Sequence, residues 1–572
     1  MSKHPPLPHD LLDPQDADAQ GARRSASVIT VRDGTAGIEV LLLRRGVRQG
    51  DMRSGVWVFP GGVLDAADAE LPALAKGLDE AALNARMGVT KGGALYLLGG
   101  LRECYEEVGL LWADGAVDAA VAARARGHED TDFVALCRRH GLALRADALA
   151  YHGHWLTPLG MPQRFDTRFF VAVAPPGLAA EADDGEAQEL AWLTPTEALS
   201  SARNLKMLPV TRALLQDAGR HATAQAFWDA TAARTPPARV MPRLARNAQG
   251  PWPVLPDHPA FAEVARLDPQ GQGTAYVDLV AGRVVTLSPL LKRITCGNGG
   301  LMSGPGTNSY VLSSPGATEA AVLDPGPLSE AGHDAPAHVQ ALIAAAAPAR
   351  ITRIVLTHTH QDHSPATALL KAATGAQVIG RVAAHPEWQD AAFAPDHQPT
   401  DGERITAAPG CTLRAVATPG HASNHLCWLL EQEGLLFTGD HIMQGSTVVI
   451  NPPDGDMRAY LASLERLLEE PLAWLAPGHG FLMADAHGEV RRLLAHRRGR
   501  EAKAWRALDA QGPATTAALV ATVYGDVPTD RHALAVRSLN AIYEQLAADG
   551  HVRADGTLWQ ALSAPPSVTA AT

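Results

Sequence analysis

Paired cysteines, long apolar runs and excess positive charge are all missing from this 572-residue sequence. Its five cysteines are scattered and form no C-x-x-C pair, which argues against a disulfide framework and against a cysteine-based zinc site. No apolar stretch is long enough to span a bilayer, and the N-terminal segment lacks the apolar core of a secretory signal. We therefore expect a cytoplasmic protein with reduced thiols and no membrane partner.

The charge and length of the chain further restrict the class of protein to which it can belong. A formal net charge of -12 opposes general attraction to nucleic acid or anionic membranes. An apolar content of 46% and a charged content of 19% are typical of soluble proteins. Because one hydrophobic core rarely serves more than roughly 250 residues, the length predicts about three domains.

Composition shifts along the chain suggest where these domains lie. Residues 1–24 are rich in Pro, Asp and His and are predicted to be a disordered leader. Prolines accumulate again in residues 233–262, which we interpret as an extended linker. Strand-like and helix-like segments alternate from about 276 to 496, and helix-like segments dominate from 500 to 546. Residues 550–559 are predicted to form a small hairpin.

Four metal-competent side chains stand within six residues near the middle of the chain. His358, His360, Asp362 and His363 directly follow the apolar run 354–356, so a buried strand is expected to deliver a tight ligand loop. Histidine nitrogen and carboxylate oxygen are ligands that zinc prefers. Ser364, as an N-cap, and a later glycine predict a helix after the loop.

Four other segments place a further histidine or aspartate after an apolar strand or on a glycine turn. They end at Asp324, His421, Asp440 and His479. Clustered histidines and aspartates are costly to bury without a metal ion, so a purely structural role for the whole set is disfavoured. The sequence predicts that these segments meet the central loop in one metal site.

These motifs, in this order, resemble those of the metallo-β-lactamase superfamily over about residues 276–495. The resemblance implies an αββα sandwich and a binuclear site holding two zinc ions, with manganese or iron as alternatives. It implies that His358, His360 and His421 hold one metal, that Asp362, His363 and His479 hold the other, that Asp440 bridges them, and that Asp324 orients the site without binding metal. Asp362 is also expected to act in catalysis, and the nucleophile is expected to be a metal-bound hydroxide.

A second chemical motif lies in the N-terminal third. If residues 97–107 form a helix, Glu103, Glu106 and Glu107 fall at i, i+3 and i+4 and share one face. Three such carboxylates repel one another unless a hard cation, Mg²⁺ or Mn²⁺, lies among them. The alternative is an exposed acidic helix with Arg102 in surface ion pairs.

The segment from Arg102 to Gly109 resembles the core of the Nudix box, and residues 59–62, Phe-Pro-Gly-Gly, resemble its opening. Together with the sequence that follows it up to residue 232, this motif is similar to the peroxisomal type of Nudix coenzyme A diphosphatase. The resemblance implies an α/β/α sandwich in which Glu106 and Glu107 bind metal, Glu103 is a ligand or general base, and Arg102 orients the carboxylates.

One departure from the Nudix pattern affects this interpretation. Gly62 and Arg102 lie 40 positions apart, which indicates an insertion, and the usual upstream glutamate is missing, with Asp65 and Asp68 as candidates for its place. A Nudix domain that only binds a ligand and regulates the other domain therefore stays open as an alternative.

The C-terminal segment resembles the winged-helix tail of lactamase-β-like-2 type proteins, a type linked to cleavage of single-stranded RNA. Basic side chains cluster at its start, at Arg491, Arg492, Arg497, Arg498, Arg500, Lys503 and Arg506. Over the segment as a whole acidic residues nearly balance the basic ones, so RNA binding is disfavoured and a packing or homodimerisation role is favoured.

The sequence thus predicts an α/β and α+β multidomain metallohydrolase. The predicted parts are a leader (1–24), a Nudix domain (25–232), a linker (233–262), a metallo-β-lactamase-fold domain (263–495) and a winged-helix-like module (496–565). The expected substrates are small molecules: an ester or thioester for the second domain, and a CoA-like or nucleoside diphosphate for the first. The alternative for the second domain is a phosphodiesterase or endoribonuclease acting on single-stranded RNA.

Overall fold

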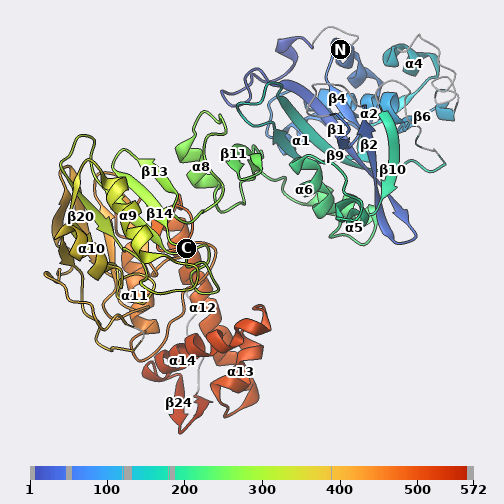
Figure 1. Ribbon diagram of the computed structural model, residues 1–572. Coiled ribbons are helices and arrows are strands. Elements are labelled where there is room, and N and C mark those ends of the chain that lie inside the picture. Colours follow the sequence, from blue (N-terminus) through green and yellow to red (C-terminus); the bar gives the residue numbers. More distant parts are fainter. Residues whose placement is uncertain are drawn as a thin grey trace. The chain divides into compact units, whose positions relative to one another are not determined.

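The chain, seen here in a computed structural model, divides into two compact units (Figure 1). One unit consists mainly of residues 1–244 and the other mainly of residues 274–572. The structure describes residues 7–46, 54–118, 120, 132–177, 180, 187–387 and 389–562. No helix in these ranges combines the length and the apolar character that a membrane span requires.

The first unit is built on a seven-stranded mixed sheet with the main order β10-β2-β1-β9-β8, in which β3 pairs with β2 and β4 with β1. Its strands are β1 (Arg23–Gly34), β2 (Gly37–Arg45), β3 (Trp57–Val58), β4 (Gly61–Val63), β8 (Leu149–Leu156), β9 (Phe165–Val173) and β10 (Ala187–Leu193). Alternate residues of β1 face opposite sides. Val28 packs in a core with Leu98 and Leu101, whereas Ile29 packs with Leu214 and Phe227.

Those two cores place helices on both faces of the sheet, which is the predicted α/β/α sandwich. The helix α2 (Gly93–Val108) covers one face, and α6 (Pro209–Ala218) and α7 (Ala224–Ala233) cover the other. The smaller elements are α1 (Glu80–Met87), α4 (Phe133–Arg139), α5 (Pro195–Leu199), the 3₁₀ helix η2 (Ala66–Leu74) and the three-stranded sheet of β5 (Ala75–Lys76), β7 (Ala143–Arg145) and β6 (Ala113–Asp114). The insertion after Gly62 thus folds as η2, β5 and α1.

The predicted disordered leader is wrong for residues 7–24. Leu12 is 2% exposed and belongs to the same core as Leu41, and the Asp13 carboxylate accepts a hydrogen bond from the Thr90 amide at 2.6 Å. The partners of this segment come from the insertion and the sheet, far along the chain, so local composition could not reveal them. Residues 1–6 lie outside the described residues.

The second unit contains two facing sheets. The six-stranded sheet runs β13 (Val284–Ser288), β14 (Leu291–Thr295), β15 (Asn308–Leu312), β16 (Glu319–Leu323), β17 (Arg350–Val355) and β18 (Gln377–Ile379). The five-stranded sheet runs β19 (Arg404–Ala408), β20 (Cys411–Ala417), β21 (Leu426–Leu430), β22 (Leu435–Gly439) and β23 (Trp474–Pro477). Their inner faces share one core, which includes Tyr310, Trp428 and Phe437.

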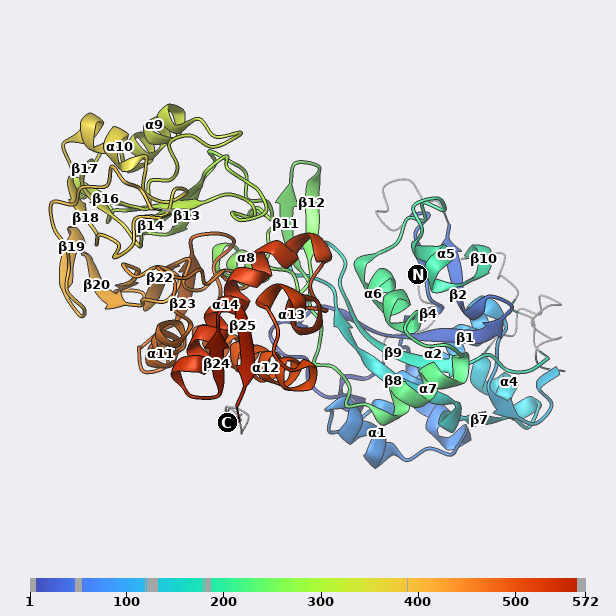
Figure 2. The ribbon, with the colours of Figure 1, turned by 90° about the horizontal axis from the view of Figure 1, so that it is seen from below.

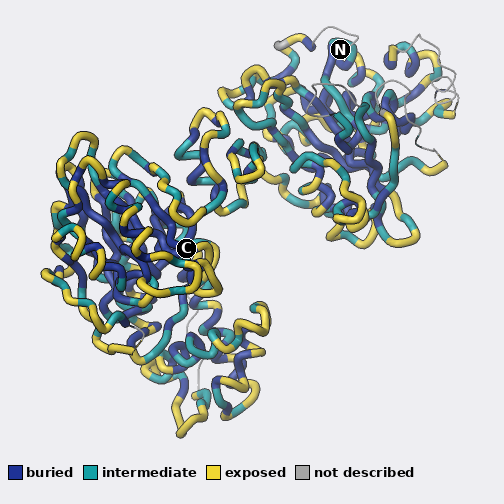
Figure 3. Tube along the Cα trace, viewed as in Figure 1, coloured by how far each residue is buried: buried dark blue, intermediate teal, exposed yellow. Residues whose placement is uncertain are grey.

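Helices cover the outer face of each sheet, as the αββα prediction requires. The helices α9 (Ala335–Ala346) and α10 (Thr367–Thr374) pack on the first sheet, and α11 (Met457–Leu467) and α12 (Ala486–Gln511) pack on the second (Figure 2). Burial follows this arrangement: β15, β16, β21 and β22 are buried along nearly their whole length, and dark blue dominates the interior of the unit in Figure 3.

The C-terminal module is continuous with the sandwich. The predicted boundary between residues 495 and 496 falls inside α12, which leads into α13 (Thr516–Val523), α14 (His532–Ala548), β24 (Val552–Asp555) and β25 (Leu558–Ala561). Leu539 and Ile542 of α14 share a core with Leu429 and Leu475 of the second sheet. The hairpin predicted for 550–559 is confirmed by β24 and β25.

The predicted linker (233–262) contains regular structure: β11 (Arg243–Asn247), β12 (Gly250–Val254) and the start of α8 (Phe261–Leu267), which continues into the predicted metallo-β-lactamase-fold domain. Glu263 of α8 makes a bidentate ion pair with Arg293 at 2.6 and 2.8 Å, and both side chains are 2% exposed. Glu263 is the first residue of the predicted metallo-β-lactamase-fold domain. Within the predicted linker itself, Ala245, Val254 and Ala260 are fully buried, contrary to the expectation that this segment would pack little.

Candidate functional site

The ligand loop follows β17 as predicted, and four other strand ends in the same unit meet it. β16 and β17 are parallel neighbours, as are β22 and β23, so Asp324, the loop, Asp440 and His479 follow strands that end on the same side. His421 arrives from the turn after β20. The predicted helix after the loop forms as α10, but Ala366 precedes it, and Ser364 instead donates a hydrogen bond to Asp390 at 2.7 Å.

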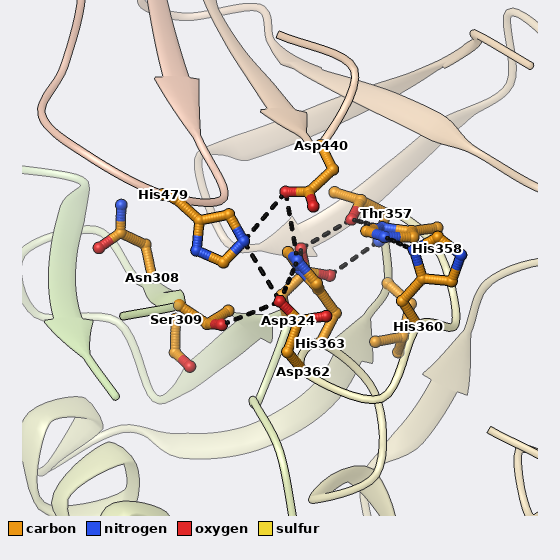
Figure 4. A network of polar contacts seen from close by, with 12 residues as sticks. Asn308, Ser309, Asp324, Thr357, His358, His360, Asp362, His363, Asp440 and His479 are labelled. Carbon is orange, nitrogen blue, oxygen red and sulfur yellow. Dashed lines mark hydrogen bonds and ion pairs between the residues drawn. The ribbon is translucent and has the colours of Figure 1, made fainter. Parts of the chain in front are cut away.

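His358, His360 and His421 form one group of converging nitrogens, called here the three-histidine group. Figure 4 shows His358 and His360 side by side on the ligand loop. The His360 Nδ1 atom lies 3.0 Å from His358 Nε2 and 3.0 Å from His421 Nε2. Burial and the neighbouring His421 lower the pKa of His360 to about 3. The ring is therefore neutral at pH 7, with nitrogen lone pairs available to a cation.

Asp362, His363, Asp440 and His479 form the other group, called the mixed group. His479 Nε2 lies 3.2 Å from Asp362 Oδ2 and 3.2 Å from Asp440 Oδ1, and His363 Nε2 lies 3.3 Å from Asp440 Oδ1. Burial alone would lower the pKa of His479, but Asp440 and Asp362 outweigh it and raise that pKa to about 10. Positive charge at this position is thus strongly favoured.

The donor set fits metal ions. In each group the ligand atoms all lie within 4.8 Å of one another. Within the described part of the chain, the buried atoms His363 Nε2, His479 Nε2 and Asp440 Oδ1 have no hydrogen-bond partner, a costly condition that a cation would relieve. Asp440 Oδ2 lies 3.7 Å from His421 Nε2, so this carboxylate stands between the two groups. A side chain at Gly478 would intrude, since a Cβ there would lie 2.8 Å from Asp440 Oδ1.

The histidines are oriented by hydrogen bonds that their ring nitrogens donate on the side away from the metal-binding atoms. His421 Nδ1 donates to the Val449 carbonyl at 2.8 Å, and His479 Nδ1 donates to the Gly306 carbonyl at 3.2 Å. A carbonyl can only accept, so Nδ1 carries a proton in both rings and Nε2 is the nitrogen that faces the site. His363 Nδ1 donates in the same way to Asp324 at 3.1 Å.

Asp324 also holds the ligand loop itself. Its Oδ1 accepts from the Thr357 amide at 2.8 Å, and its Oδ2 accepts from the Thr357 hydroxyl at 2.7 Å. It is 1% exposed and is held at a positive φ of 51°. These contacts are those expected of a residue that orients the site from outside the ligand groups.

We expect Asp324→Asn to weaken metal binding without unfolding the sandwich. An amide presents one acceptor where the carboxylate presents two, so one of the donors at Thr357 and His363 loses its partner. Outer hydrogen bonds of this kind contribute roughly 10–100-fold to metal affinity. Zinc competition with a chelator measures the change. Asp334→Asn is the matched control, because Asp334 caps α9 on the surface and asparagine caps equally well; equal affinities in the two variants would contradict the assignment.

The acidic motif lies on α2 of the first unit, and its arginine is buried. Arg102 is 4% exposed and contacts Asp68 at 2.7 Å, Glu106 at 2.9 Å and Glu103 at 3.0 Å. The alternative of an exposed acidic helix with surface ion pairs is therefore wrong. Glu107 accepts a hydrogen bond from the Gly61 amide at 2.7 Å, which ties the helix to the Pro-Gly-Gly turn.

The two candidate upstream acids have different contacts. Asp68 is fully buried against Arg102, whereas Asp65 lies 3.8 Å from that guanidinium and caps η2. Burial raises the pKa of Glu103 to about 8 in spite of Arg102. Across the described residues, the close ligand groups are the three-histidine group and the mixed group, so the three glutamates are not gathered as tightly as the ligands of the second unit.

The basic cluster of the C-terminal module is largely engaged within the fold. Arg497 and Arg500 are buried, and Arg500 pairs with Asp526 at 2.6 Å. Arg492 pairs with Glu489, and Arg498 pairs with Glu465. These side chains hold the module together, which removes much of the reason for assigning them to a phosphate backbone.

Two buried histidines near the site were not assigned from the sequence. The ring of His425 lies 5.0 Å from that of His358, and His441 packs on Tyr460. His425 Nε2 and both nitrogens of His441 are buried and find no hydrogen-bond partner in the residues that the structure describes. A lone histidine carries no spacing signal, so no pattern in the sequence could have distinguished them from structural residues.

Comparison with known families matches each part of the chain. Residues 303–479 match the metallo-beta-lactamase superfamily, residues 89–210 match the NUDT19 Nudix domain, and residues 515–559 match the beta-lactamase associated winged helix domain. The Nudix match begins after most of the insertion that follows Gly62.

Individual relatives are similar to the second unit. An atrochrysone carboxyl ACP thioesterase of Aspergillus fumigatus is 30% identical over 262 residues, which cover 43% of this chain and 77% of the relative. The corresponding enzyme AgnL7 of Paecilomyces divaricatus is 28% identical over 283 residues, covering 47% and 83%. A metallo-beta-lactamase family protein of Thermus thermophilus, with a solved structure, is 22% identical with a TM-score of 0.41, covering 48% and 100%.

Proposed function

The chain belongs to the metallo-β-lactamase superfamily and carries a Nudix domain, and from this premise we propose that it is a double hydrolase. In this proposal the second unit cleaves a thioester or ester at the three-histidine and mixed groups. The first unit cleaves a CoA-like or nucleoside diphosphate at the acidic face of α2.

The observation that carries the proposal is the set of seven converging side chains that could bind metal, three of whose buried atoms have no hydrogen-bond partner among the described residues. Two zinc ions, or manganese or iron, would be held by this set. When bound, they supply Lewis acidity and activate water at neutral pH. The assignment to a thioester is further supported by the two relatives named as ACP thioesterases.

The protein's own residues perform defined tasks in this proposal. His421 and His479 are fixed by backbone carbonyls, so each presents Nε2 in a preset direction. Asp440 stands between the groups and supplies negative charge to both. Asp362, which lies 3.5 Å from the Thr307 hydroxyl, is held at the edge of the mixed group, where it can bind metal and take part in proton transfer.

In the first unit, Glu106 and Glu107 would hold Mg²⁺ or Mn²⁺, with Glu103 as a further ligand or general base. Arg102 holds the carboxylates of Glu103 and Glu106 in place. Asp68 takes the place of the missing upstream glutamate, since its carboxylate holds Arg102 from the insertion side. A catalytic Nudix domain is thereby favoured over a domain that only binds a ligand.

The test is a parallel assay of the full chain with acyl-CoA, acyl-glutathione and single-stranded RNA, with zinc and magnesium supplied. We expect hydrolysis of the thioester bond of acyl-CoA or acyl-glutathione that is lost in His360→Ala. We also expect cleavage of the diphosphate linkage of CoA that is lost in Glu106→Gln. Each variant should keep the other activity. RNA cleavage that depends on His360, with no thioester cleavage, would replace the proposal with the endoribonuclease alternative.

Substitution of Gly62 offers a sharper test of the Nudix site. A Cβ at this position would lie 2.4 Å from the Glu103 carboxylate, which is the mobile end of a long side chain. We therefore expect Gly62→Ala to displace Glu103 and lower CoA cleavage about as much as Glu103→Gln, with little loss of stability. Thermal unfolding and steady-state kinetics measure both effects. Full activity in Gly62→Ala together with an inactive Glu103→Gln variant would contradict the placement of Glu103.

A further inference from the structure

The segment 448–450 connects the metal site to the rest of the second unit. It has no regular secondary structure and lies between β22 and α11. The carbonyl of Val449 accepts the hydrogen bond from His421 Nδ1 at 2.8 Å. Because that bond sets the proton position and the ring orientation, the location of this one carbonyl decides where His421 Nε2 points.

Both neighbours of Val449 are bonded to the C-terminal module. Arg497 of α12 donates to the Val448 carbonyl at 2.5 Å. Ser538 of α14 accepts from the Ile450 amide at 3.1 Å. Val448 and Ile450 are 2% and 0% exposed and belong to one core with Leu493 of α12 and Leu539 of α14. The segment is therefore bonded on either side of the carbonyl that orients His421.

Arg497 is built into this arrangement rather than presented to solvent. It is 4% exposed, and its guanidinium lies over the ring of Tyr460 at 5.1 Å. A buried guanidinium with a fixed geometry can hold a carbonyl in one place because its donors form a rigid fork. The same burial makes Arg497 unsuitable as a contact to a nucleic acid backbone.

We propose that the C-terminal module is a positioning element of the metal site, in which Arg497 and Ser538 hold segment 448–450 so that Val449 orients His421. The inference rests on the proposed function of the binuclear site. It assigns the module a role in the three-histidine group alone, because these contacts reach His421 and not the mixed group.

The experiment is a Co²⁺ titration of the full chain, in competition with a chelator and followed by visible absorption. The wild-type chain should bind two Co²⁺. The absorption change in His421→Ala shows how the titration looks when Co²⁺ binding at the three-histidine group is lost. We expect Ser538→Ala to weaken binding at that same group by roughly tenfold, the lower end of the usual range for outer hydrogen bonds, with the affinity of the mixed group unchanged. Arg497→Lys should act in the same direction, since it loses the fork.

The matched control is Thr516→Val in α13. Thr516 belongs to the same module and is 7% exposed, and its hydroxyl accepts from Trp559 at 3.0 Å, whereas the bonds to Val448 and Ile450 come from Arg497 and Ser538. A general loss of module stability would affect this variant as well. Unchanged Co²⁺ affinity in Ser538→Ala, equal weakening at both groups, or the same effect in Thr516→Val would overturn the inference while leaving the proposed function standing. A wild-type chain that binds no Co²⁺ would overturn both.

Discussion

Asp440→Ala should abolish thioester hydrolysis by the second unit while CoA diphosphate cleavage by the first unit continues. Asp440 is 8% exposed, and its two oxygens face different groups: Oδ1 contacts His363 and His479, and Oδ2 approaches His421. Its removal takes negative charge from both groups at once. The loss of activity should therefore exceed the roughly 10–100-fold that follows removal of an outer hydrogen-bond partner.

Two measurements separate this effect from misfolding. Metal content should fall below two ions per chain, and kcat/KM for acyl-CoA should fall in parallel. Asp396→Ala is the control, because Asp396 is a carboxylate on the surface of the same sandwich that pairs with Lys371 at 2.8 Å. Retention of two metals and of full acyl-CoA activity in Asp440→Ala would show that the carboxylate is dispensable and that the chemistry lies elsewhere.

The sequence predicted the convergence of these histidine and aspartate side chains because their positions are coupled to regular structure. Each ligand follows an apolar strand or a glycine turn, and parallel strands such as β22 and β23 deliver the residues after them to one side of a sheet. The hydrogen bonds that orient the ligands were not predictable in this way. His421 and His479 are held by the carbonyls of Val449 and Gly306, and a backbone carbonyl has no signature in a sequence.

The fold was predicted at the level of layers but not at the level of boundaries. The two sandwiches were implied by the resemblance of short motifs, each local in the chain, to the metallo-β-lactamase superfamily and to the Nudix box. The leader, the linker and the boundary at 495/496 were misplaced because long-range contacts decide them. Leu12 is buried by residues of the insertion and the sheet, and Arg246 of the predicted linker exchanges backbone hydrogen bonds with Ala275 and Val277. Neither contact can be predicted from the local amino-acid composition.

The largest effect on stability is expected from Arg102→Leu. Arg102 is the common partner of Asp68, Glu103 and Glu106, and Asp68 is fully buried. Its loss leaves buried carboxylates without a compensating charge, which typically costs about 3–5 kcal/mol. Glu106 is partly exposed to solvent and contributes less than the other two. We expect the first unit to unfold at lower denaturant while the transition of the second unit stays in place.

Double substitution distinguishes a charge effect from lost packing. If uncompensated charge causes the loss, Asp68→Leu combined with Arg102→Leu should recover part of the stability, because replacing both partners of a buried pair is often nearly neutral. The free energy of unfolding of Arg102→Lys should lie between those of wild type and Arg102→Leu, since lysine keeps the charge but cannot form the planar fork that contacts three carboxylates. A loss below about 1 kcal/mol in Arg102→Leu would mean that these contacts behave as surface pairs. In that case the raised pKa of Glu103 and the orienting role of Arg102 would both need another origin, because each depends on the burial of this one network.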